Sequence, residues 1–468
     1  MFVIKKSSYL FSISTFLFYS MASYAFNSHI AVGTYLEKNS FAPLLLTSHN
    51  NGLTWAHNKN ISGLPPHLGN LSIDYINCDA STCVAGGQSQ IGQTIHPVLL
   101  VSNDKGNTWS YINKISGFPS QADKLNIKAI RCTENSCIVA GQLHTNQKDM
   151  PMLLVSTNHH TSWSLIPNIA GLPQTYYASI SSLSCTEHTC IAVGEYIINK
   201  SKIPLLLRSI DGGQSWSLKS IPALPADIWR SYLDAVECSG NTCIIGGSYR
   251  TIKNSFTEKL LLAVSHDKGA SWKLIETITD FPQNVDFNSP IKYIHCKQNQ
   301  CVTSGQYDEN SMTSYPLILT SADNGDSWSA VKTISGLSHF QQFSLNTGPM
   351  DCSGSTCVIT GMKVNEPYHG NPSPLLLISQ NHGHSWSAIN LVLGFPYRQV
   401  QEINTYAVHC KDMTCMVSGS YLDKLTHDAT KTVPMLLVSQ TKGLTWTFNL
   451  PLNQTVGELH NLAIINEV

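Results

Sequence analysis

A motif that ends in tryptophan recurs along the whole chain at intervals of 53 to 60 residues. One copy, residues 102–109, reads SNDKGNTW and follows an apolar run at residues 97–101. A fixed period near fifty residues predicts a propeller or a solenoid, in which each repeat is one supersecondary unit. Eight of the nine tryptophans close such a copy: Trp55, Trp109, Trp163, Trp216, Trp272, Trp328, Trp386 and Trp446.

The chemistry of the motif predicts a tight turn between two strands. An Asp or Asn at its third place can accept hydrogen bonds from backbone amides just ahead of it. A Gly at its fifth place can adopt positive φ without a Cβ clash. The tryptophan then starts the next strand and covers the turn. Aspartate occupies the third place at Asp104, Asp211, Asp267 and Asp323, and asparagine replaces it at Asn50, Asn158 and Asn381.

This pattern resembles the Asp-box, or BNR repeat, of sialidases and their relatives, and the resemblance covers nearly the whole chain after residue 25. The resemblance implies a β-propeller in which the boxes are structural. It also implies that ligands bind at the end of the ring away from the boxes. It says almost nothing about activity, because one fold carries many functions.

The fourteen cysteines form seven pairs, each with four residues between its members, and none is left over. A zinc site needs four ligands, and no second pair or histidine pair lies at ligand spacing. We therefore expect local cross-strand disulfides, no metal and no cofactor. The expected bonds are Cys78 with Cys83, Cys132 with Cys137, Cys185 with Cys190, Cys238 with Cys243, Cys296 with Cys301, Cys352 with Cys357, and Cys410 with Cys415.

Each repeat divides into four short strands separated by Gly and Pro, which is typical of a propeller blade. Residues 29–35 match a second strand that has no first strand before it, and residues 459–466 match a first strand that has no second strand after it. The two ends therefore complete one blade, with His29 and Asn466 where an eighth cysteine pair would stand. We expect an all-β, eight-bladed propeller closed by the C-terminal strand; seven cysteine pairs leave seven blades as the alternative.

Residues 1–25 have the features of a secretory signal: Lys5 and Lys6, an apolar stretch, and small residues before a cleavage site after Ala25. The alternative is an uncleaved membrane anchor. We expect residues 26–468 to form a single propeller domain, secreted or periplasmic, without a membrane anchor and monomeric. The net charge of −1 gives no reason to expect a nucleic-acid partner.

Aromatic residues after the second-strand glycine are candidates for sugar stacking at the ligand end. The alternative is that these rings pack between blades with their hydroxyls in water. Trp229 is the one tryptophan outside the repeat, and it adjoins Arg230; Arg398 lies in a comparable loop. The candidate ligand-binding residues are Tyr35, Tyr196, Trp229, Arg230, Tyr249, Tyr307, Arg398 and Tyr421.

The residue before the first cysteine of each pair is polar or charged, which predicts a mixed ring lining the central channel. Its members are Asn77, Arg131, Ser184, Glu237, His295, Asp351 and His409. His295, Asp351 and His409 have metal-ligand chemistry. We expect them on non-adjacent blades, however, and so predict no metal site there.

The sialidase catalytic motifs are absent: there is no Arg-Ile-Pro, and the chain has only five arginines. We therefore expect a disulfide-stapled scaffold that binds a protein or a glycan, and no sialidase activity. The alternative is a glycoside hydrolase of non-sialidase specificity, using two loop carboxylates. Convergence of two or three carboxylates and an arginine in one pocket would favour the hydrolase. Asp123, Asp227 and Asp280 lie in suitable loops.

Overall fold

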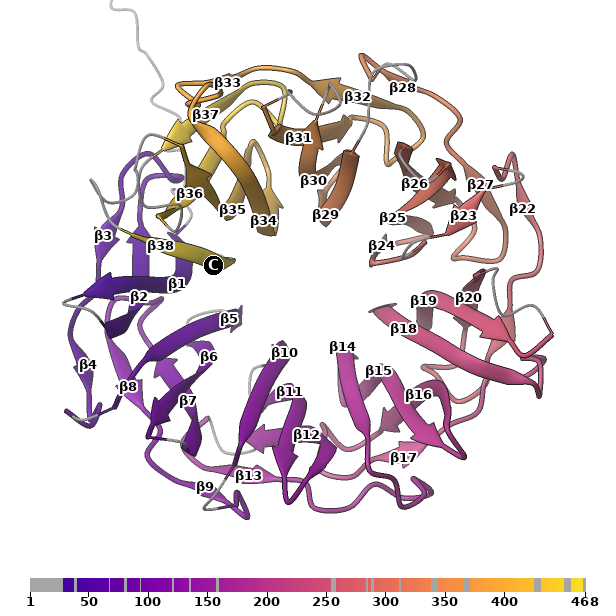
Figure 1. Cartoon of the computed structure of the whole chain (residues 1–468), viewed down its shortest axis with the longest axis horizontal. Coiled ribbons are helices and arrows are strands. Elements are labelled where there is room, and N and C mark those ends of the chain that lie inside the picture. Colours follow the sequence, from indigo (N-terminus) through magenta and orange to yellow (C-terminus); the bar gives the residue numbers. More distant parts are fainter. Residues whose placement is uncertain are drawn as a thin grey trace, which may run out of the picture.

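The chain folds into a ring of eight sheets around a central axis, as the computed structural model in Figure 1 shows. The eight-bladed prediction is confirmed, and the seven-bladed alternative is wrong. The structure describes residues 28–465 apart from 38–39, 67, 80–81, 93, 120–121, 134–135, 157–159, 254–257, 283–284, 288–289, 311–312, 338–343, 365–370, 425–430 and 450–455. The predicted signal, residues 1–25, lies outside this range.

Each blade has its first strand innermost and its fourth strand at the outer rim. We number the blades in chain order of their second strands. The innermost strands of blades 1 to 8 are β38 (Gly457–Ile465), β5 (Leu71–Asp79), β10 (Lys124–Thr133), β14 (Ala178–Thr186), β18 (Ile228–Ser239), β24 (Tyr293–Lys297) with β23 (Asp286–Phe287), β29 (Ser344–Ser353) and β34 (Val400–Lys411). The second strands are β1 (Ser28–Glu37), β6 (Thr82–Ile91), β11 (Ser136–Thr145), β15 (Thr189–Ile198), β19 (Thr242–Thr251), β25 (Gln300–Asn310), β30 (Thr356–Val364) and β35 (Thr414–Asp423).

The third strands carry the apolar runs that precede the tryptophan motif. They are β2 (Ser40–Ser48), β7 (Thr94–Ser102), β12 (Lys148–Ser156), β16 (Ser201–Ser209), β20 (Lys259–Ser265), β26 (Thr313–Ser321), β31 (Ser373–Ser379) and β36 (Thr432–Ser439). The fourth strands are β3 (Ala56–His57), β8 (Trp109–Tyr111), β13 (Trp163–Leu165), β17 (Ser217–Leu218), β21 (Lys273–Leu274), β27 (Trp328–Ala330), β32 (Trp386–Ile389) and β37 (Trp446–Asn449).

Five blades add a short fifth strand, parallel to the fourth, that comes from the end of the preceding repeat. These strands are β4 (Ile61–Ser62), β9 (Ile115–Ser116), β22 (Ile278–Thr279), β28 (Ile334–Ser335) and β33 (Val392–Leu393). Each one ties a blade to its predecessor along the outer rim (Figure 1).

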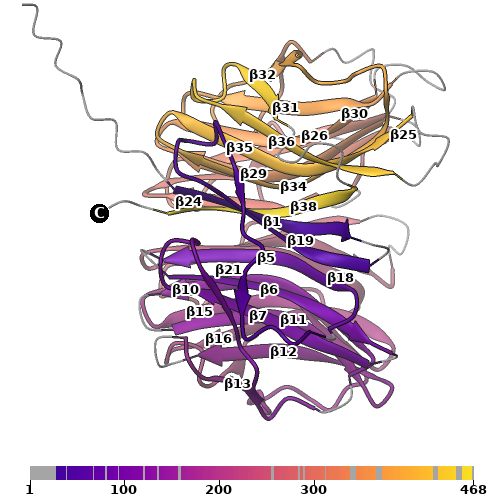
Figure 2. The same cartoon turned by 90° about the vertical axis from the view of Figure 1, so that its left-hand side faces the viewer.

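The C-terminal strand β38 closes the ring by pairing antiparallel with β1, and Figure 2 shows the two side by side. The predicted closure is therefore confirmed, but its register differs from the prediction by two residues. His29 pairs with Ile464, not with Asn466, which lies outside the described residues. A shift of two keeps every side chain on the same face of the sheet, so the apolar pattern cannot distinguish the two registers.

The hydrophobic core is a set of layers between neighbouring blades. One cluster joins Ile30 and Leu45 of blade 1 to Ile73 and Trp109 of blade 2. Another joins blade 1, including Leu459 and Leu462 of β38, to Met416 and Leu436 of blade 8. Because blade 1 packs on both of these neighbours, the ring is closed by side-chain packing as well as by β38.

The tryptophan motif forms the same turn in successive blades. In blade 2, Asp104 Oδ1 accepts hydrogen bonds from Ser102 Oγ and Thr108 N at 2.8 Å each. Gly106 has φ of 81°, which favours glycine, and a Cβ there would lie 2.3 Å from Ile30 Cδ1 of blade 1. The carboxylate of a turn aspartate thus accepts its hydrogen bonds from residues of its own turn. In blade 5, the hydroxyl and then the N–H of Ser271 lower the pKa of Asp267 to about 2.

All seven disulfides join the two cysteines of one pair, and the predicted local pairing is confirmed at every position. The bonds are Cys78 to Cys83, Cys132 to Cys137, Cys185 to Cys190, Cys238 to Cys243, Cys296 to Cys301, Cys352 to Cys357, and Cys410 to Cys415. In each bond the first cysteine ends the innermost strand and the second cysteine begins the second strand, where the two residues face each other in the register.

The disulfides lie at the end of each blade that also carries the tryptophan turn. Cys137, for example, pairs across the sheet with Ser156, which immediately precedes the turn of blade 3. We call this the disulfide end of the ring and the opposite side the loop end. Seven intrachain disulfides indicate an oxidising compartment. No helix in the described part of the chain is long and apolar enough to span a membrane.

Candidate functional site

The innermost strands share a β-bulge that shapes the wall of the channel. In seven blades the pairing register between the innermost strand and the second strand shifts at the same place. In β5 the shift lies between Ile73 and Tyr75, and in β38 it lies opposite Val32 and Gly33. A Cβ on the second-strand glycine would lie about 2 Å from the carbonyl oxygen before the bulge, for example 1.9 Å between Gly87 and Ser72 O. The repeated glycine therefore makes room for the bulge, which commonly re-aims a side chain.

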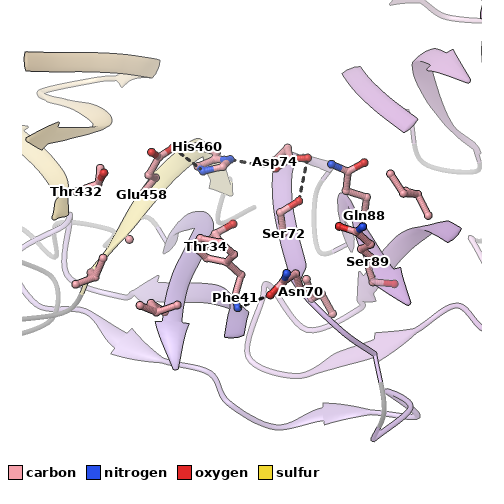
Figure 3. Close-up of a pocket in the computed structure, with 16 residues that line it drawn as sticks. Thr34, Phe41, Asn70, Ser72, Asp74, Gln88, Ser89, Thr432, Glu458 and His460 are labelled. Atoms are coloured by element: carbon pink, nitrogen blue, oxygen red, sulfur yellow. Dashed lines mark hydrogen bonds and ion pairs between the residues drawn. The ribbon is translucent and has the colours of Figure 1, made fainter. Parts of the chain in front are cut away.

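The skipped residues in blades 1 and 2 are His460 and Asp74, and both line a pocket between these blades. The pocket has a volume of about 690 Å³ and lies towards the loop end. Figure 3 shows its walls, which come from both ends of the chain. They are Thr34, Leu36, Phe41, Asn70, Leu71, Ser72, Asp74, Gln88, Ser89, Gln90, Ile95, Thr432, Val456, Gly457, Glu458 and His460.

A histidine between two carboxylates forms the charged centre of the pocket (Figure 3). His460 Nδ1 lies 3.1 Å from Asp74 Oδ1, and His460 Nε2 lies 3.2 Å from Glu458 Oε2. Tyr406 of blade 8 donates a hydrogen bond to Glu458 Oε2 at 3.1 Å. The group therefore connects blade 8, through β38 of blade 1, to blade 2.

The ion pairs decide the protonation state of this centre. Burial alone would lower the pKa of His460, but its interactions with the Asp74 and Glu458 carboxylates outweigh burial and raise the pKa to about 9. The His460 imidazolium in turn lowers the pKa of Glu458. At neutral pH His460 is thus protonated and Glu458 is ionised.

Uncharged polar side chains make up much of the remaining wall. Thr34 Oγ1, Gln88 Oε1 and Ser89 Oγ are buried and have no hydrogen-bond partner among the described residues. Leaving such groups without a partner costs free energy. Phe41, with 49% of its surface exposed, adds an accessible aromatic ring.

A second hollow of about 320 Å³ lies in the central channel and shares Asp74 and His460 with the pocket. Tyr75 of blade 2 and Tyr293 of blade 6 line it from opposite parts of the ring. Burial raises the pKa of each of these tyrosines to about 12, so both hydroxyls are protonated at neutral pH. The pocket therefore continues into the channel past His460.

The five tyrosines predicted to bind ligand lie on the second strands, towards the loop end, and pack within the blades. Tyr196 and Tyr421 are buried in apolar clusters. Tyr35 contacts the ring of His57, Tyr307 contacts Tyr315, and Tyr249 packs against the core of blade 5. None of the five lines the pocket between blades 1 and 2. Their role in ligand binding stays a prediction.

The remaining predicted residues are spread over two blades. Trp229 lies on β18 with its indole Nε1 buried and without a partner among the described residues. The guanidinium of Arg230 donates to the hydroxyl of Tyr232 and lies 5.0 Å from its ring centroid. Arg398 is exposed in the loop before β34. The structure does not bring these three residues together with the pocket.

The polar ring before the first cysteines bridges one blade to the next. Asn77, Ser184 and Asp351 each accept a hydrogen bond from the backbone N–H of the first cysteine in the following blade, at 2.9, 3.0 and 2.7 Å. Asp351 also lies 3.4 Å from His295 Nδ1 and 2.6 Å from His409 Nδ1.

The expectation that His295, Asp351 and His409 lie on non-adjacent blades is wrong. They lie on consecutive blades 6, 7 and 8, because each repeat contributes one such residue and the repeats follow the ring in order. Among the described residues, no group of three His, Cys, Asp or Glu side chains could hold a metal ion.

The residues of the charged centre were missed in the sequence. Asp74 and His460 are 386 residues apart, and only closure of the ring brings them together. One signal was available. The C-terminal strand was expected to be the innermost strand of blade 1, and blade 1 neighbours blade 2. A charged residue at the same bulge of two neighbouring strands would then have predicted their contact.

No protein-family model matches the chain, and no curated protein matches it. Solved structures resemble it at low identity. YCF48 bound to D1 peptide is 13% identical, with a TM-score of 0.39 over 76% of this chain and 100% of that chain. A PL25 ulvan lyase is 11% identical, with a TM-score of 0.48 over 80% of this chain and 92% of that chain. A Trypanosoma rangeli sialidase is 14% identical, with a TM-score of 0.38 over 82% of this chain and 57% of that chain.

Proposed function

We propose that this protein is an exported, disulfide-stapled propeller that binds a neutral or basic glycan in the pocket between blades 1 and 2. The observation that carries the proposal is the composition of the pocket wall. Hydroxyl, amide and carboxylate groups share the wall of a space of about 690 Å³ with apolar side chains, and Phe41 exposes a ring beside them. Sugars offer many hydroxyls to such groups and an apolar ring face to an aromatic side chain.

The charge of the pocket narrows the ligand class. Asp74 and Glu458 outnumber His460, and no lysine or arginine is among the described residues that line the pocket. An acidic sugar such as a sialoside would face two carboxylates without a compensating guanidinium. We therefore expect uncharged or amino sugars to bind better than acidic ones.

A glycan array with residues 26–468 tests the proposal, followed by calorimetric titration of the best ligand. Gln88→Ala and Phe41→Ala remove one polar contact and one ring from the pocket wall. Each should weaken binding by about tenfold, which corresponds to about 1.4 kcal/mol. Tyr176→Ala is the matched control, because Tyr176 is an aromatic residue with 59% of its surface exposed away from the pocket. No binding on the array, or equal losses in all three variants, would refute the proposal.

The second candidate function is glycoside hydrolysis: two carboxylates share one pocket, as expected for a hydrolase, but the arginine expected with them is not among the described residues that line it. A hydrolase of this kind needs one carboxyl protonated and one ionised. The ion pair with His460 lowers the pKa of Glu458, so Glu458 is not a proton donor at neutral pH. Release of nitrophenol from a panel of nitrophenyl glycosides, abolished by Asp74→Asn, would favour hydrolysis over binding alone.

A further inference from the structure

The outer rim of the ring contains a repeated strand pairing that blades 1 and 5 lack among the described residues. In blade 1 the equivalent segment, residues 450–455, lies outside the described residues. In five blades the fifth strand places an Ile or Val opposite the tryptophan of the fourth strand, as in Ile115 opposite Trp163. The next residue is Ser in three of these blades and Thr or Leu in the other two. The other four register pairs are Ile61 with Trp109, Ile278 with Trp328, Ile334 with Trp386, and Val392 with Trp446.

Blade 4 shows the same pairing reduced to a single bridge, and it identifies the two hydrogen bonds involved. Ala170 N–H donates to Trp216 O at 2.9 Å, and Leu218 N–H donates to Ala170 O at 2.8 Å. The residue that follows the aliphatic position therefore supplies both the donor and the acceptor.

Blade 5 has no such strand among its described residues: its sheet ends at β21. The reason is that Pro222 stands where Ala170 stands in the preceding repeat, and proline has no N–H to donate. The connection is also shorter, since Ile221 follows Trp216 by five residues whereas Ile169 follows Trp163 by six. The turn itself persists, with Ala223 at φ of 63° where Gly171 has 80°.

A groove occupies the place of the missing strand. It has a volume of about 550 Å³ and lies between Pro222–Ala223 and the edge formed by Trp272, Leu274 and Ile275. Ile275 N–H donates to Leu262 O within the blade. The alternation of a strand then directs Leu274 N–H and Trp272 C=O outwards, as in blade 4. No hydrogen bond joins these two groups to the segment at 219–225, all of which the structure describes.

We propose that this groove binds an extended peptide of a partner protein as a fifth strand parallel to β21. The five complete blades define the chemistry of the peptide: an Ile or Val opposite Trp272, then a Ser, Thr or Leu whose N–H and C=O pair with Trp272 O and Leu274 N–H. Such addition of a strand to an exposed sheet edge is a known mode of peptide recognition. The site lies on the rim, away from the pocket between blades 1 and 2, and does not depend on the function proposed for that pocket.

A labelled peptide copied from this chain, residues 113–119 (NKISGFP), is the probe. Its fluorescence anisotropy is measured against the full chain after residue 25. Methylation of the Ser116 amide blocks the bond to Trp272 O and should weaken binding at least tenfold. Methylation of the Ile115 amide is the matched control, because that N–H points away from β21, and it should leave the affinity within twofold.

Leu274→Pro removes the outward donor from the protein and should cause the same loss, provided that its melting curve shows a folded ring. The absence of saturable binding would overturn the proposal, as would equal affinity for the two methylated peptides. A dimer in sedimentation that the unmodified peptide dissociates would mean that a second copy occupies the groove, and would also overturn it.

Discussion

Deleting residues 459–468 removes the strand that closes the ring and should destabilise the protein more than the loss of any single disulfide. Leu459 and Leu462 are buried, with 0% and 7% of their surface exposed. Their burial contributes about 3–6 kcal/mol together, and the backbone pairing with β1 adds to this. One disulfide across five residues contributes about 2 kcal/mol on the chain-entropy model. The deletion therefore removes a large part of the roughly 5–15 kcal/mol that is typical for a domain.

The assay is thermal unfolding of the mature chain, followed by near-ultraviolet circular dichroism. The comparison is with Cys78→Ser combined with Cys83→Ser, which cuts one disulfide. The truncated protein should melt at a lower temperature than this double variant, and its yield should fall because β1 presents an unpaired edge. If the truncated protein keeps the melting temperature of the full mature chain, β38 does not hold the ring together and the reasoning is refuted.

Three further predictions concern closure, pH and activity. His29→Cys with Ile464→Cys should form an eighth disulfide across the closure and raise stability by more than about 4 kcal/mol, since the loop it closes spans most of the chain; unchanged unfolding of the oxidised variant would contradict this. The pKa of His460 is about 9 in the folded chain and about 6.5 unfolded, so its ion pairs stabilise fully below pH 6.5 and their contribution is lost as pH rises through 9. Melting temperatures between about pH 6 and 10 should show this loss, up to about 3 kcal/mol, in the native protein and not in His460→Gln. Finally, a generic sialoside should not be cleaved; turnover that disappears in Arg230→Ala or Arg398→Ala would contradict the binding role.

The repeat predicts the ring because the same sequence period determines where the strands of every blade lie. Eight tryptophans at the same position of the repeat indicate eight equivalent turns. The strand at each end of the chain has no partner in its own repeat, so the two terminal strands are expected to pair with each other. The register of closure was predicted wrongly because alternation has a period of two residues. Asn466 and Ile464 satisfy it equally, and the structure pairs His29 with Ile464.

The pocket could not be predicted in the same way because it depends on departures from the repeat. Asp74, Glu458 and His460 share no motif, and no periodic signal marks them. The tyrosines after the second-strand glycine do recur, and because they recur they were chosen as candidate ligand-binding residues. The structure places them within the blades, where a side chain repeated from blade to blade packs in the same way each time.

The location of the bound glycan tests the central proposal most directly. Hydrogen exchange followed by mass spectrometry, with and without the best array ligand, reports which backbone amides the ligand protects. Protection should appear in peptides covering β38 and the start of β5, because these strands carry Glu458, His460 and Asp74. Protection confined to the blades that carry Tyr196 and Tyr249, with none in β38 or β5, would contradict the assignment of the site.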